Sequence, residues 1–125
     1  MDEAVEKLVG RMADAGYVND RLFAESKAAS LGRRGYGARR VREALSAAGI
    51  DEADQAEARE SAEENAWAAA LRFAERKRLG PFAAQVPDRA AREKAIAAFL
   101  RAGHPSAIAR RLASAAPGAV PDPDA

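Results

Sequence analysis

The sequence predicts an all-α protein, an elongated array of tandem three-helix units, and three observations lead to this fold class. Alanine, the strongest helix former, supplies 34 of the 125 residues, whereas the β-branched and aromatic residues that favour strands are few. Apolar residues recur with a helical period in successive segments, and no segment shows the alternation of a half-buried strand. Short sequence matches also recur at an offset of about 50 residues, which is typical of helical repeat proteins.

The first part of the chain is expected to form two helices separated by a break. Gly16 is predicted to end the first helix, and Asn19 or Asp20 to cap the second by accepting backbone N–H groups. The apolar stripe of the first helix has the spacing i, i+3, i+4, i+7 and comprises Val5, Leu8, Val9 and Met12. Three glycines interrupt the second helix at its end, and these are Gly32, Gly35 and Gly37.

A third helix is predicted over residues 38–48, with Gly49 at its end. Residues 51–79 then allow two interpretations. Either a short helix begins at Asp51 and a new helix begins at Ser61, or one long helix spans the whole segment. The inward-facing residues expected in this segment are Ala53, Ala56 and Ala62, followed by Trp67, Ala70, Leu71 and Ala74.

Two further helices are predicted after a Gly-Pro stop at Gly80 and a short loop. Asp88 is expected to cap the first of them and Gly103 to end it, and the last helix opens at Pro105 or Ser106. The apolar faces of this helix pair comprise Ile96, Phe99, Leu100, Ile108 and Leu112.

The internal matches define the expected domain organisation. The clearest match is the segment Phe23-Ala24-Glu25-x-Lys27, which recurs as Phe73-Ala74-Glu75-x-Lys77. Units of this size stack on their neighbours, because one unit alone cannot bury its apolar face. The register predicts the last helix of an incomplete first unit at residues 1–18, three-helix units at 19–60 and 61–116, and a disordered tail at 117–125.

The residue inventory argues against an enzyme and against a metal or cofactor site. The chain has no cysteine, which excludes thiol catalysis, disulfides and cysteine metal ligands. Its one histidine, His104, is expected to be a loop residue or a charge at a helix C-terminus. No apolar run approaches the length of a membrane span, and no secretory signal opens the sequence. We therefore expect a cytoplasmic protein without cofactor, metal or membrane partner.

The net charge of +1 conceals an uneven distribution of charge along the chain. Residues 20–50 carry seven basic and three acidic side chains, residues 51–64 carry one and seven, and residues 65–116 carry ten and three. The two basic blocks indicate either solvated helix faces or surfaces for a polyanion or an acidic protein groove. The candidate contact residues are Arg33, Arg34, Arg39, Arg40, Arg42, Arg72, Arg76, Lys77, Arg89, Arg92, Lys94 and Arg101. Tyr36 is expected to pack across its turn rather than to stack on a base.

Three blocks of the sequence together resemble the RecX regulatory family, in the family's order and over most of residues 5–112. The blocks are Gly16-Tyr17-Val18-Asn19-Asp20-x-x-Phe23-Ala24, Arg34-Gly35-Tyr36-Gly37-x-Arg39-Arg40-Val41-x-x-x-Leu45-x-x-x-Gly49-Ile50, and Asp88-x-x-x-x-Glu93-Lys94-x-x-x-x-x-Leu100-Arg101-x-Gly103. The resemblance implies structural roles for Tyr17, Asp20 and Phe23, as a helix junction with its cap and core anchor, and for the helix ends at Gly49 and Gly103.

The resemblance also implies a function. Members of the RecX family lodge along the groove of the filament that RecA forms on single-stranded DNA, and they inhibit the ATPase, strand-exchange and coprotease activities of RecA in DNA repair and the SOS response. On this hypothesis the chain is a monomer that binds single-stranded DNA weakly and salt-dependently on its own. The sequence leaves two alternatives open, a small DNA-binding module of the helix-turn-helix type and a structural helical-repeat adaptor.

Overall fold

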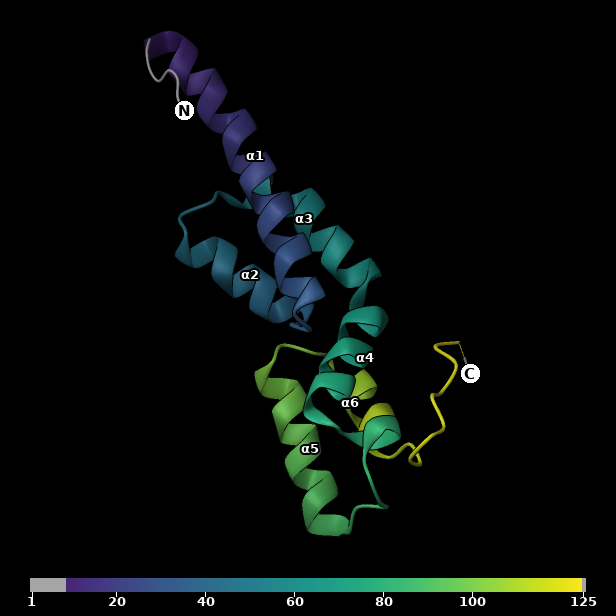
Figure 1. Cartoon of the computed structure of the whole chain (residues 1–125). Coiled ribbons are helices and arrows are strands. Elements are labelled where there is room, and N and C mark those ends of the chain that lie inside the picture. The colour runs from purple at the N-terminus through teal and green to yellow at the C-terminus, as the bar shows by residue number, and fades with distance from the viewer. Residues whose placement is uncertain (1–8, 125) are drawn as a thin grey trace.

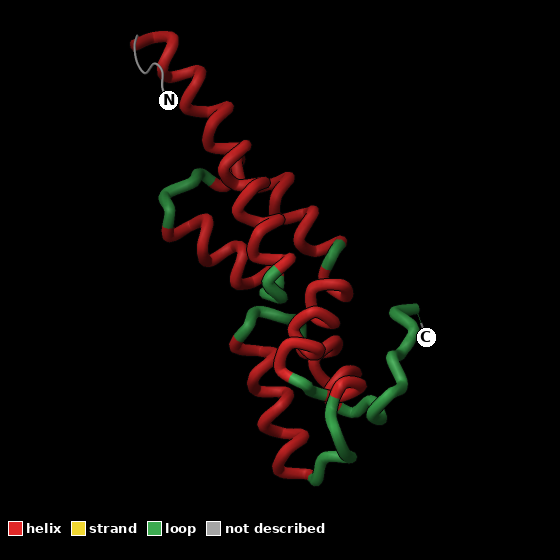
Figure 2. Tube along the Cα trace, viewed as in Figure 1, coloured by secondary structure: helices red, strands yellow, loops and turns green. Residues whose placement is uncertain are grey.

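The computed structural model describes the backbone of residues 9–124 and the side chains of residues 19–124. Its elements are α1 (Val9–Arg33), α2 (Ala38–Ala47), α3 (Glu52–Glu64), α4 (Ala66–Lys77), the 3-10 helix η1 (Gly80–Phe82), α5 (Arg89–Arg101) and α6 (Ser106–Ala113). The described part of the chain contains no strand, which confirms the all-α fold class (Figure 2). The molecule is elongated, with the start of α1 at one end and α5 at the other (Figure 1).

Helices α1, α2 and α3 pack together, and we call them the first helix group. Each helix contributes small or aliphatic side chains at helical spacing to one core. On α2 the pair Val41 and Leu45 forms the buried face, and both are almost inaccessible to solvent. The remaining core residues are Ala24, Ala28, Leu31, Ile50 and Ala58.

Helices α4, α5 and α6 form the second helix group around a more aromatic core. The rings of Phe73 on α4 and Phe99 on α5 lie 5.1 Å apart, centroid to centroid, in a tilted arrangement. Leu112 on α6 is fully buried against them. The chain passes tightly over α6 at Gly80, where an added Cβ would lie 1.9 Å from the carbonyl oxygen of Leu112, so the position requires glycine.

The predicted break between the first two helices is wrong, because α1 runs without interruption through Gly16. The helix can continue because a single glycine costs it only about 1 kcal/mol. Asn19 and Asp20 therefore lie inside α1 and do not cap a helix. Phe23 is 45% exposed and is not a core anchor. The buried stripe of α1 comprises Ala24, Ala28 and Leu31, and Phe23 lies about 100° around the helix from Ala24.

Part of the predicted first helix lies outside the described residues. Val5 and Leu8 lie outside the described residues, and so do the side chains of Val9, Met12 and Tyr17. The expected roles of these side chains, including that of Tyr17 at a helix junction, stay predictions.

Neither interpretation of residues 51–79 is correct. One placed a new helix start at Ser61 and the other placed no break, whereas the structure breaks the helix at Asn65. The side chain of Asn65 donates a 2.8 Å hydrogen bond to the carbonyl oxygen of Ser61, which satisfies one of the last carbonyls of α3. The buried face of α3 was also predicted incorrectly, since Ala53 and Ala56 are exposed.

Polar residues occupy the buried face of α3 instead. Asp54 accepts a 3.0 Å hydrogen bond from the guanidinium of Arg21 on α1, although Asp54 is only 4% exposed. The side-chain amide of Gln55 donates a hydrogen bond of 2.7 Å to the carbonyl oxygen of Ile50. Buried polar groups are tolerated when they are hydrogen-bonded, and a search for apolar spacing does not detect them.

The segment after α6, which we expected to be disordered, is hydrogen-bonded to the second helix group. The amide of Gly118 donates 2.7 Å to the carbonyl oxygen of Pro81. The guanidinium of Arg111 donates to the carbonyl oxygens of Asp122 and Pro123, at 2.6 and 3.0 Å. These bonds hold the segment beside α6, as Figure 1 shows in yellow.

Candidate functional site

The two helix groups meet where the turn between α1 and α2 touches the end of α5. The amide of Gly37 donates a hydrogen bond of 2.8 Å to the carbonyl oxygen of Ala102. The amide of Arg39 donates one of 3.2 Å to the carbonyl oxygen of Gly103. The N–H groups at the start of α2 thus bond the carbonyls of the turn that ends α5, and opposite ends of two helix dipoles meet. We call this contact the junction.

Three glycines allow the backbones to approach each other at the junction. An added Cβ on Gly37 would lie 2.5 Å from the carbonyl carbon and oxygen of Gly103, and one on Gly103 would lie 2.6 Å from the amide nitrogen of Arg40. Gly35, with a φ of +90°, lies against the backbone of Phe73. The sequence identified these glycines only as helix breaks, whereas in the fold they are contact surfaces.

Two of the predicted contact arginines complete the junction with their side chains. The guanidinium of Arg39 donates to the carbonyl oxygen of Leu100, and that of Arg40 donates 3.4 Å to the carbonyl oxygen of Arg101. Arg39 also pairs with Glu43, 3.7 Å away on the next turn of α2. These side chains cap the C-terminal end of α5 as basic groups commonly do.

Tyr36 packs across the turn, as expected, and joins the two cores. Its ring is partly buried against residues of both helix groups. The guanidinium carbons of Arg40 and Arg34 lie 4.6 and 5.3 Å from the ring centroid, which is cation–π distance. The ring is therefore already engaged by two cations of its own chain.

His104 lies in the loop between α5 and α6, as expected, but it is buried in the junction and is not an exposed charge at a helix C-terminus. It is 4% exposed, its Nε2 lies 2.8 Å from the carbonyl oxygen of Gly35, and its ring packs against those of Phe73 and Phe99. Burial lowers the pKa of His104, and the hydrogen bond to Gly35 opposes that shift only in part. The neutral ring donates through Nε2, while Nδ1 is buried without a partner.

An open groove of about 640 Å³ lies between α4 and α5 and ends at Tyr36. Its floor is apolar and is formed by Phe73, Leu79, Ala91, Ala95, Ala98 and Ala102. Every charged residue that lines it is basic, and these residues are Arg40, Lys77, Lys94 and Arg101. We call this feature the basic groove, and it unites four of the twelve predicted contact residues.

The other predicted contact residues are distributed over different parts of the surface. Arg33 and Arg72 line a smaller hollow of about 220 Å³ between α1, α3 and α4, where Arg72 donates 3.2 Å to the carbonyl oxygen of Gly32. The groove and the hollow share Tyr36. Outside both lie Arg34 and Arg39 at the junction, Arg42 on α2, Arg76 on α4, and Arg89 and Arg92 on α5.

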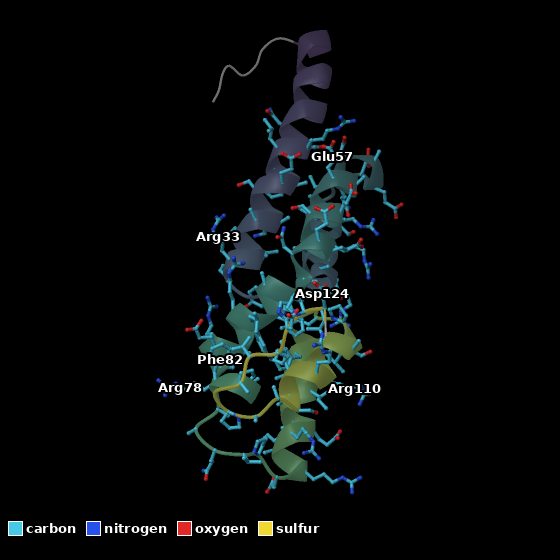
Figure 3. The ribbon with its side chains drawn as sticks, turned by 90° about the vertical axis from the view of Figure 1, so that its right-hand side faces the viewer. Arg33, Glu57, Arg78, Phe82, Arg110 and Asp124 are labelled. Atoms are coloured by element: carbon cyan, nitrogen blue, oxygen red, sulfur yellow. The ribbon has the colours of Figure 1, made fainter. Side chains whose placement is uncertain are left out.

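The charged side chains therefore do not share a single face of the molecule. Figure 3 shows Arg33 and Arg78 projecting on one side and Arg110 on the other, with Glu57 on the acidic helix α3. What concentrates positive charge is the basic groove, because its charged residues converge on one apolar floor. Sequence reasoning missed that floor, and the glycines around Tyr36 were its only local signal.

The described residues hold neither a cluster of metal-ligating side chains nor a membrane-spanning helix. They contain no group of three or more histidine, cysteine, aspartate or glutamate side chains placed to hold a metal ion. Within the same residues, no helix combines the length and the apolar character needed to cross a membrane.

Part of the chain matches the model of a known protein family. The family model described as RecX, second three-helix domain, matches residues 19–58. The matched segment extends from the middle of α1 into α3 and includes the turn with Tyr36. No curated protein and no solved structure matches the chain.

Proposed function

We propose that this chain is a RecX-family protein and a non-enzymatic regulator of RecA, because residues 19–58 match the second three-helix domain of RecX. In this proposal the chain binds, as a monomer in the cytoplasm, to the filament of RecA on single-stranded DNA. Binding lowers the ATPase, strand-exchange and coprotease activities of RecA, and so restrains recombination and the SOS response. The observation that carries the proposal is the match of residues 19–58 to the RecX three-helix domain.

The basic groove supports this proposal through its charge. A RecA–DNA filament presents DNA phosphates and acidic protein surface, and both attract clustered cationic side chains. The four cations of the groove converge next to the turn that belongs to the matched domain. The family-matched region and the basic surface are therefore contiguous.

The elongated shape supports the proposal as well. The two helix groups follow one another along the molecule (Figure 1), so that contacts made by one group hold the other close to the filament. Several weak contacts along a polymeric partner then give a stable complex, even though each contact alone is short-lived. This mode of binding requires neither a catalytic group nor a deep pocket.

The test is a titration of the chain into RecA that is hydrolysing ATP on circular single-stranded DNA. We expect the rate of hydrolysis to fall progressively as the chain is added, also when RecA filaments have formed beforehand. A rate that stays constant at a stoichiometric excess of the chain contradicts the proposal.

A second measurement separates action on RecA from sequestration of DNA. The affinity of the chain for a labelled oligo(dT) is measured by fluorescence anisotropy at two salt concentrations in the absence of RecA. We expect weak binding that salt reduces further, because only phosphate contacts contribute. Tight binding at the concentrations that lower hydrolysis would mean that the chain simply removes DNA from RecA.

A further inference from the structure

The floor of the basic groove is built to accept apolar side chains. Four alanines line it along α5 at positions that share one face of the helix, which are Ala91, Ala95, Ala98 and Ala102. Because alanine is short, the space above these residues is free for side chains that enter from outside. Across the groove, α4 and the residues after it contribute Phe73 and Leu79.

The rim of the groove carries cations that have no acidic partner within the part of the chain that the structure describes. Among the described residues, the ion pairs are Arg21 with Asp54 and Arg39 with Glu43, so the charges of Lys77, Lys94 and Arg101 are unpaired. Lys94 and Arg101 lie two turns apart on α5, about 10 Å along the helix axis. A ligand in the groove is therefore favoured if it carries anionic groups on both sides of an apolar centre.

A nucleic acid strand fits this combination poorly. Single-stranded DNA gains affinity when its bases stack on free aromatic rings. Arg34 and Arg40 already lie over the ring of Tyr36, and Phe73 is only 7% exposed. A DNA strand would gain from the charges of the rim alone, whereas a protein segment gains from both the rim and the apolar floor.

The geometry points to a helical protein segment as the occupant, and we propose that the basic groove binds an acidic amphipathic helix of the partner. The lining residues on α5 extend from Ala91 to Ala102, about 17 Å or three helical turns. A helix laid along them would place apolar residues at i, i+4 and i+7 on the floor and carboxylates against Lys77, Lys94 and Arg101. This inference rests on the proposed function, since the partner is then a protein of the RecA filament.

The test uses a fluorescein-labelled acidic peptide that forms an amphipathic helix, with leucines at i, i+4 and i+7 and glutamates on the flanks. A matched peptide carries glutamine in place of every glutamate, and oligo(dT) serves as the nucleic acid probe. We expect the acidic peptide to bind the full chain with a dissociation constant on the order of 10–100 μM, and the glutamine peptide to bind at least about tenfold more weakly.

Charge reversal locates the binding site. The double variant Lys77→Glu/Lys94→Glu should weaken binding of the acidic peptide at least about tenfold, because two cations of the rim become anions. Both residues are exposed, so the variant keeps its fold, which circular dichroism verifies. The control variant Lys27→Glu/Arg110→Glu makes the same change of net charge outside the groove and should leave peptide affinity within about twofold.

Three outcomes would overturn the inference. The first is acidic-peptide affinity that Lys77→Glu/Lys94→Glu leaves unchanged, and the second is an equal loss in the control variant. The third is binding of oligo(dT) in place of the peptide: the wild-type chain binds oligo(dT) but not the acidic peptide, and Lys77→Glu/Lys94→Glu abolishes the binding of oligo(dT).

RecA assays on the same proteins distinguish this inference from the proposed function. If the wild-type chain binds the peptide but does not lower ATP hydrolysis, the proposed function fails and the groove assignment holds. If Lys77→Glu/Lys94→Glu lowers hydrolysis as well as the wild type does and no peptide binds, the groove assignment fails and the proposed function holds.

Discussion

The two helix groups differ in what fills their cores and in what they present outside. The apolar core of the first group is aliphatic, and its helix α3 also buries the polar side chains of Asp54 and Gln55. The second group instead buries the rings of Phe73, Phe99 and His104. The first contains the segment that matches the RecX domain, and the second contains both walls of the basic groove. The sequence match and the basic groove thus lie mostly in different halves of the molecule, and the turn with Tyr36 connects them.

The largest effect is expected from removing a core side chain in either group. Phe99→Ala should lower the free energy of unfolding by about 3–5 kcal/mol, and Leu45→Ala by about 2–5 kcal/mol, because both side chains are fully buried. Urea unfolding is followed by circular dichroism and by the fluorescence of Trp67, which lies in the second group.

This pair of variants also shows whether the groups unfold together. If the junction couples them, Leu45→Ala in the first group shifts the Trp67 transition by as much as the circular dichroism transition. A Trp67 transition that Leu45→Ala leaves in place would show that the two groups unfold independently.

The next largest effect is expected from Gly37→Ala at the junction. The new Cβ would lie 2.5 Å from the backbone of Gly103, so the two groups must separate locally, at a cost of about 1–3 kcal/mol. The matched control is Gly32→Ala, where the added Cβ has no atom within 4 Å. This control should be neutral or stabilising by up to about 1 kcal/mol. Equal destabilisation by both substitutions in urea unfolding would refute the close contact.

A smaller effect is expected when the pH falls. Burial lowers the pKa of His104 in the folded protein, so below the ordinary pKa of about 6.5 the unfolded chain binds more protons than the folded chain. Stability is therefore complete above pH 6.5 and declines as the pH falls from that value toward the lower pKa of the folded state. The decline should not exceed about 1.4 kcal/mol per pH unit.

The measurement is urea unfolding at several pH values between about 5 and 7, where histidine titrates and most carboxylates do not. Because the chain has one histidine, His104→Gln should flatten this dependence, whatever its effect on stability at pH 7. If the stability of the wild type did not change with pH, the buried ring of His104 would be protonated in the folded protein as readily as in the unfolded chain.

The smallest effect on stability is expected from substitutions at the helix starts of the two groups. Asp88 caps α5 in the second group by accepting a 2.8 Å bond from the amide of Ala91, and Asp88→Ala should cost about 1 kcal/mol. Asp51 holds the same position before α3, but its side chain accepts no such bond. Asp51→Ala should therefore cost clearly less than Asp88→Ala in thermal unfolding, and a reversed order would contradict the two cap geometries.

Local signals in the sequence predicted much of the fold. Gly49 and Gly103 have positive φ angles at the ends of α2 and α5, where their residue type predicted helix ends, and Asp88 begins α5 as a capping residue does. The same rules failed at Gly16 and on the buried face of α3. A single glycine costs a helix only about 1 kcal/mol and need not end it. Buried polar residues such as Asp54 are hydrogen-bonded to partners distant in sequence, which local spacing does not reveal.

The site was less accessible to sequence reasoning than the fold. The arginines were recognisable as charge, but Arg39 bonds a carbonyl 61 residues away, and no local pattern encodes such a contact. The burial of His104 and the convergence of Lys77 with Lys94 likewise follow from how α4, α5 and the turn meet. Predicting the groove therefore required the packing of the two groups in addition to the order of the helices.

Hydrogen–deuterium exchange of the chain with and without a preformed RecA–DNA filament tests where the partner binds. We expect added protection of amides in both walls of the basic groove, residues 73–79 and 91–102, together with the turn at residues 34–37. Protection confined to the acidic helix α3, with both groove walls unchanged in the bound chain, would contradict it.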